Sequence, residues 1–165
     1  MTALHNHGAA VSGVKAEILM STAAANAGYS ILKIKSDYEQ AGVDPMGKRF
    51  FRKPEWYPTL LKETPTAKES FYESDGFIQA KNTGIILELK NSNKHGTTEE
   101  KVFYDLEKIR DGVYGTEHEL WYIFAGDVAE NTGVYKLFEA KAKKENLPVR
   151  IIWGFDGLEQ ALREL

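Results

Sequence analysis

Two short apolar segments, separated by a polar turn, mark the middle of the chain. Residues 73–79 (ESDGFIQ) and 84–90 (GIILELK) each contain β-branched or aromatic residues, and the AKNT segment between them is rich in residues typical of turns. This pattern predicts a β-hairpin whose turn centres on residues 81–82. The pairs expected in that register are Gln79 with Gly84, Phe77 with Ile86, and Asp75 with Glu88.

A helix is predicted after the hairpin, over residues 98–111. Thr97 and Glu100 form a capping-box pattern at its start. Apolar residues then recur at helical spacing, at Val102, Phe103, Leu106, Ile109 and Val113. The charged residues expected on other faces of this helix are Lys101, Asp105 and Lys108.

Periodicity elsewhere predicts an alternation of strands and helices. Strands are expected at residues 29–35, 119–125 and 149–153, and helices at residues 14–27, 131–146 and the C-terminal end. Because a strand, a helix and a second strand in succession form a crossover unit, the strands on either side of helix 98–111 should be parallel. The sequence thus predicts one α/β domain over residues 1–165, with a mixed sheet and an irregular insertion at about 37–72 that holds four of the five prolines.

Two acids and a lysine meet in the predicted hairpin. Like charges directly opposite each other on a sheet repel, so Asp75 and Glu88 favour a cation between them. Side chains alternate along a strand, so Glu88 and Lys90 share one face, which we expect to be polar, while Leu87 and Leu89 point to the core. One or two carboxylates suffice for Mg²⁺, which keeps waters and takes phosphate oxygens. Lys90 can then orient or stabilise a metal-activated water.

The same residues also have a structural interpretation. Alternating charge and leucine is typical of any half-exposed strand, and in that case Asp75 and Lys90 are surface charges of an α/β domain that is not a nuclease.

The string Ser74-Asp75-Gly76, followed by Glu88-Leu89-Lys90, resembles the PD-(D/E)XK nuclease superfamily. The resemblance runs from about Val14 to Ala125 and implies a restriction-endonuclease-like αβββαβ core. It also implies that Asp75 and Glu88 bind Mg²⁺, for which Mn²⁺ substitutes, and that Lys90 contacts the attacking water. Ser74 stands where the motif has a proline, which makes the motif less specific.

Further site residues are expected outside the hairpin. Many members of that superfamily place a glutamate on an N-terminal helix near the metal, and Glu17 is the only acid of the predicted helix 14–27, with Ser12 as N-cap and Gly28 as its end. The helix macrodipole alone also favours an acid in the first turn. His95 in a polar loop and Lys101 near a helix N-terminus are candidate phosphate contacts, although each is also typical of a solvated surface.

A basic segment with aromatic residues precedes the hairpin. Its cations, Lys48, Arg49, Arg52 and Lys53, surround Phe50 and Phe51. Such interleaving suits backbone contact with base stacking and predicts a DNA-recognition element. The alternative is an aromatic patch that packs on the core or on a dimer partner.

Composition narrows the function classes. The net charge of -3 argues against indiscriminate nucleic-acid binding, and the absence of cysteine excludes disulfides and thiolate zinc sites. No membrane span, signal pattern or glycine-rich nucleotide site is evident, so we expect a cytoplasmic protein without a nucleotide cofactor. The leading hypothesis is a Mg²⁺-dependent DNA endonuclease of restriction, homing or junction-resolving type, acting as a homodimer. The alternative is a catalytically silent DNA- or protein-binding module with the same fold.

Overall fold

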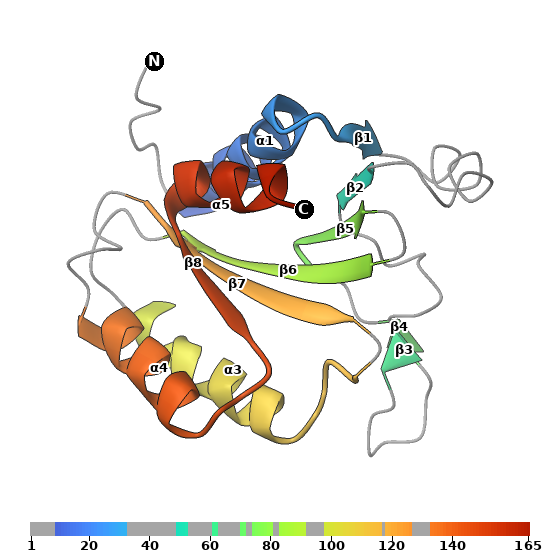
Figure 1. The fold of residues 1–165 in the computed structure, drawn as a ribbon. Helices are drawn as coiled ribbons and strands as arrows, with labels where there is room; N and C mark the ends of the chain where they lie inside the picture. The colour runs from blue at the N-terminus through green and yellow to red at the C-terminus, as the bar shows by residue number, and fades with distance from the viewer. Residues whose placement is uncertain are drawn as a thin grey trace.

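Helices cover both faces of a six-stranded mixed sheet whose strand order is β1-β2-β5-β6-β7-β8 (Figure 1). The computed structural model describes residues 9–32, 49–52, 61–62, 70–71, 74–80, 83–91, 98–116, 118–126 and 133–165. Within these ranges no helix is long and apolar enough to cross a membrane. The α/β class with a mixed sheet flanked by helices is confirmed.

In the described residues one helix is followed by six strands, after which helices and strands alternate to the end of the chain. The sheet strands are β1 (Ser30–Leu32), β2 (Arg49–Arg52), β5 (Gly76–Ala80), β6 (Thr83–Asn91), β7 (Glu119–Ala125) and β8 (Arg150–Trp153). A separate pair is formed by β3 (Leu61–Lys62) and β4 (Ser70–Phe71). The helices are α1 (Ala9–Asn26), α3 (Thr98–Arg110), α4 (Gly133–Lys144) and α5 (Gly154–Arg163).

The predicted hairpin forms in the predicted register. β5 and β6 are antiparallel, with Gln79 opposite Gly84 and Phe77 opposite Ile86. The ladder ends at the pair Gly76 and Leu87, one residue before Asp75 would meet Glu88. The hairpin therefore brings Asp75, just before β5, close to the part of β6 that carries Glu88.

The strands after the hairpin are parallel, as the crossover argument predicted. β6 pairs in parallel with β7, and β7 pairs in parallel with β8. The connecting helices α3 and α4 lie together below the sheet in Figure 1, whereas α1 and α5 lie above it. The second half of the fold is thus a pair of strand–helix–strand units.

Both faces of the central strands are packed, which corrects the expectation of a polar face on β6. Ile85 and Leu87 belong to the cluster beneath α1 and α5, whereas Ile86 belongs to the cluster formed with α3 and α4. Glu88 shares the face of Ile86 and is only 7% exposed. A parallel sheet is normally covered on both sides, so alternation of charge and leucine on β6 does not mark a solvent-facing surface here.

The N-terminal part of the fold departs from prediction in two places. Helix α1 begins at Ala9, so Ser12 lies inside the helix instead of capping it, whereas Gly28, at φ +91°, does follow the helix end. The insertion predicted to be irregular contributes β2 to the main sheet, parallel to β1 and antiparallel to β5. The reason is Phe50, which is fully buried in the core beneath α1.

Close packing at Gly76 gives a stability test of the hairpin. A Cβ at this position would lie 2.9 Å from the Phe50 ring and 3.2 Å from the Met20 methyl carbon. We predict that Gly76→Ala lowers the free energy of unfolding by about 1–3 kcal/mol, as overpacking does. Urea denaturation measures this value.

Gly157 on α5 is the matched control. A Cβ there meets Ile152 at 3.4 Å, an ordinary contact, and alanine favours a helix. Gly157→Ala should therefore raise the free energy of unfolding by about 0.5 kcal/mol. Equal effects of the two substitutions would contradict the packing described at Gly76.

Candidate functional site

The Asp75 carboxylate lies against the backbone that links Glu88 to Lys90. Asp75 Oδ2 accepts a hydrogen bond from the backbone N–H of Leu89 at 2.8 Å. This bond continues the contact between the two segments just past the end of the β5–β6 ladder. Ser74 is buried, and its hydroxyl donates to the carbonyl oxygen of Gly76 at 2.9 Å, which closes a tight turn around Asp75.

Lys90 is close to acids from three segments of the chain: the turn before β5, strand β6 and helix α3. Its side chain is 23% exposed, and its Nζ lies 3.1 Å from Asp105 Oδ2. Burial lowers the pKa of Lys90, but the charges of Asp105, Glu88 and Asp75 outweigh burial and raise that pKa above its ordinary value. The side chain is therefore an ammonium at neutral pH, and all three residues of the predicted motif interact within one charged cluster.

Glu88 occupies the buried end of this cluster. In the parallel ladder Glu88 stands beside Tyr122, so the two side chains share the face covered by α3. Burial, together with the charges of Asp105 and Glu88, raises the pKa of Tyr122 above its ordinary value. Tyr122 is consequently a neutral phenol that donates a hydrogen bond.

Asp105 is the central residue that sequence reasoning missed. It lies on α3, is 5% exposed, and accepts a hydrogen bond from the Tyr122 hydroxyl. Its other oxygen, Oδ1, lies 2.9 Å from Lys108 Nζ. Burial raises the pKa of Asp105, but the Tyr122 hydrogen bond and the two lysines outweigh it and hold that pKa below its usual range.

The prediction that Asp105 faces away from the apolar side of α3 is wrong. A signal was present, because Asp105 falls three residues after Val102 and four before Ile109, within the apolar stripe of the helix. An acid in such a stripe must find partners when the stripe is buried. The partners come from β6 and β7, which sequence spacing does not identify.

The other predicted site residues are placed less fully. Glu17 is half-buried on α1, the helix that covers the opposite face of the sheet from Glu88, and its place near a metal stays a prediction. Arg49 and Arg52 lie on β2 and Lys101 on α3, but the structure describes only their backbone. Lys48, Lys53 and His95 lie outside the described residues.

The aromatic partners of the basic segment are described at one position. Phe50 is fully buried in the core, so it is not available for base stacking, and the core-packing alternative holds for it.

The donor set suits a cation that takes few ligands from protein. Among the described residues no group of three or more histidine, aspartate or glutamate side chains is arranged to hold a metal ion. Asp75 and Glu88 offer two carboxylates, which is the usual protein contribution to a Mg²⁺ site completed by water and phosphate oxygens. The charges of all three carboxylates act on Lys90, and Lys108 also lies at Asp105.

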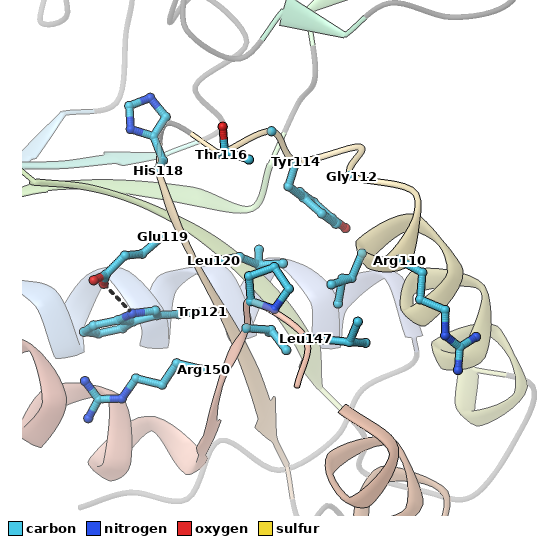
Figure 2. Close-up of a pocket in the computed structure, with 14 residues that line it drawn as sticks. Arg110, Gly112, Tyr114, Thr116, His118, Glu119, Leu120, Trp121, Leu147 and Arg150 are labelled. Atoms are coloured by element: carbon cyan, nitrogen blue, oxygen red, sulfur yellow. Dashed lines mark hydrogen bonds between the residues drawn. The ribbon is translucent and has the colours of Figure 1, made fainter. Parts of the chain in front are cut away.

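A separate hollow lies near the beginnings of β7 and β8. Its cavity volume is about 810 Å³, and its lining does not include the motif residues. Figure 2 shows Arg110 directed away from the apolar group formed by Tyr114, Leu120 and Leu147. Arg110 is held by Glu107 and Glu145, while Arg150 lies over the Trp121 ring at 4.7 Å. Two of the charged groups at this hollow, Arg110 and Arg150, therefore already have partners.

Comparison with known proteins adds a distant structural likeness. No protein-family model and no curated protein matches the sequence. Among solved structures, the chain is similar to protein VC1899 from Vibrio cholerae, with 16% sequence identity and a TM-score of 0.44. The match covers 90% of this chain and 32% of that one, so the chain spans about a third of the length of that protein.

The lowered pKa of Asp105 predicts how stability depends on pH. A carboxyl group whose folded-state pKa is depressed stabilises the fold above its unfolded pKa, about 3.9, and loses this contribution as the pH falls through the folded-state value. Asp105→Asn should therefore be about 2 kcal/mol less stable than the native protein near pH 7, the scale of a hydrogen bond to a charged group.

Urea denaturation of both proteins between pH 7 and 3 measures this dependence. The difference in unfolding free energy should stay level down to about pH 5 and shrink below about pH 4. A difference that persists unchanged at pH 3 would show that the Asp105 charge has no stabilising role.

Proposed function

We propose that this protein is a Mg²⁺-dependent DNA endonuclease that hydrolyses phosphodiester bonds. The observation that carries the proposal is the hydrogen bond from Leu89 N–H to Asp75 Oδ2, at 2.8 Å. Through this bond the first acid of the motif lies beside the segment that carries Glu88 and Lys90. The three residue types that metal-assisted phosphodiester hydrolysis requires are thus gathered at one end of the hairpin.

In this proposal Asp75 and Glu88 hold the divalent cation. Bound there, the metal would supply a water of lowered pKa and neutralise charge on the phosphate. The two carboxylates differ in surroundings, because Glu88 is buried under α3 whereas Asp75 is half-buried at the start of β5. Glu88 fixes the inner side of the site and Asp75 the side nearer to solvent.

Lys90 contributes a fixed positive charge instead of removing a proton. Its raised pKa keeps the ammonium protonated at neutral pH. An ammonium beside two carboxylates can orient a water or hydroxide and can stabilise negative charge that develops on the phosphate. The lysine therefore acts as an electrostatic group, and proton removal is left to other groups or solvent.

The order of elements also supports the proposal. Between α1 and α3 the main sheet has four strands, β1, β2, β5 and β6, and β7 follows α3, so the αβββαβ order implied by the resemblance to PD-(D/E)XK nucleases is present with β1 as an additional strand. Asp75 directly precedes β5, and Glu88 and Lys90 stand in the later part of β6. Three parts of the proposal rest on the resemblance and on the basic residues of β2. These parts are DNA as the substrate, a role of restriction, homing or junction-resolving type, and a symmetric dimer that cuts both strands.

Cleavage assays with matched variants test the proposal. Supercoiled, linear and branched DNA are incubated with the protein in Mg²⁺, in Mn²⁺ and in EDTA. We expect cleavage with either metal and none in EDTA. Asp75→Asn and Glu88→Gln should each lower the cleavage rate at least about 100-fold, because loss of a metal ligand removes several kcal/mol of charge stabilisation.

Two exposed acids outside the hairpin, Asp156 on α5 and Glu164 at the C-cap of α5, provide controls of the same chemical type. Asp156→Asn and Glu164→Gln make the same changes and should leave the cleavage rate unaltered. DNA binding by the native protein without cleavage under any metal would reject the proposal in favour of a silent binding module.

A further inference from the structure

Lys90 has a long side chain whose ammonium must be held in place to be useful. Its stem has four rotatable bonds, and fixing such a chain is entropically unfavourable unless its end has a partner. The charges of Glu88 and Asp75 act on Lys90. Lys90 Nζ also lies 3.1 Å from Asp105 Oδ2, on a different element from either motif acid.

Asp105 is itself held from two sides. The Tyr122 hydroxyl donates to Oδ2, and Lys108 Nζ lies 2.9 Å from Oδ1. Tyr122 is fully buried, and its ring packs against Phe124 and Phe138 with centroid separations of 5.4 and 5.0 Å. The Asp105 carboxylate is therefore held by the core of the α3–α4 layer independently of its contact with Lys90.

The network also connects the helix layer to the motif strand. Asp105 is on α3, Tyr122 is on β7 beside Glu88, and Lys90 is on β6. A buried carboxylate needed only for stability would already be paired by Lys108 one turn along its own helix. The second ammonium, reaching Asp105 from a different element, is the one that belongs to the motif.

We propose that Asp105 is a positioning residue, which holds the Lys90 ammonium beside Asp75 and Glu88, with Tyr122 fixing Asp105 in turn. The role in cleavage rests on the proposed function, whereas the restraint on Lys90 does not. Asp105 adds a fourth residue to the site, and that residue lies on the helix after the motif.

Asp105→Asn tests the positioning role through the kinetics of cleavage. Asparagine keeps the size of the side chain and removes its charge. The kcat for supercoiled plasmid DNA should fall about 10- to 100-fold, as for other residues that orient a site from behind. The KM for the plasmid and the Mg²⁺ concentration at half-maximal rate should stay within about twofold, because neither contact with substrate nor metal is removed.

Glu107→Gln is the control on the same helix. Glu107 is exposed and pairs with Arg110, so its substitution removes an ion pair of α3 without touching Lys90. Its kcat should equal that of the native protein. An Asp105→Asn enzyme with native kcat would overturn the positioning role.

A measurement independent of cleavage follows the Lys90 ammonium directly. In protein labelled with ¹⁵N-lysine, a held ammonium exchanges its protons slowly enough to give an NMR signal, which Lys90→Arg identifies by its absence. The signal should be present in the native protein and in Glu107→Gln and should be lost in Asp105→Asn. Persistence of the signal in Asp105→Asn would overturn the inference.

Two further outcomes keep the tests separate. If Asp105→Asn does not fold, Tyr122→Phe takes its place, because it removes only the hydroxyl that fixes Asp105. Tyr122→Phe should weaken the Lys90 NMR signal and lower kcat several-fold. No change in either quantity would overturn the inference. If the native protein cleaves no DNA, the proposed function fails, and the NMR comparison alone decides whether Asp105 holds Lys90.

Discussion

The fold places negative charge where a sheet and a helix layer meet, and this burial is the constraint on which the site depends. Glu88 and Asp105 are 7% and 5% exposed, on facing elements, and a buried carboxylate is costly unless it is paired. Lys90, Lys108 and the Tyr122 hydroxyl meet that requirement around Asp105. The same cluster brings the charges of Asp75 and Glu88 to bear on Lys90.

Local backbone geometry places Asp75 beside the segment that carries Glu88 and Lys90. The hairpin register fixes where β5 begins, and the Asp75 carboxylate, one residue earlier, accepts a hydrogen bond from the N–H of Leu89. Because Gly76 has no side chain, Phe50 and Met20 pack directly against its backbone, next to Asp75. The same short segment therefore contacts the hydrophobic core at Gly76 and the charged cluster at Asp75.

Much of this arrangement could be predicted from the sequence, and the exceptions have physical causes. The hairpin register followed from alternation and a central turn, and the parallel crossover followed from the order of elements, because both depend on local pattern. The polarity of the Glu88 face could not be read from β6 alone, since it depends on how closely α3 packs. Asp105 was passed over for the same reason: its partners Lys90 and Tyr122 are close in space but distant in sequence. The prolines of residues 37–72 predicted an irregular segment. Burial of Phe50 in the core instead places residues 49–52 in strand β2.

We propose that Asp75 and Glu88 together bind a hard divalent cation. The most direct measurement is anomalous scattering from crystals of the native protein soaked in Mn²⁺. We predict an anomalous peak within coordination distance, about 2 Å, of an oxygen from each of these two carboxylates, with Lys90 still bound to Asp105. Well-ordered Asp75 and Glu88 side chains with no peak between them, or a peak bound only elsewhere on the protein, would contradict it.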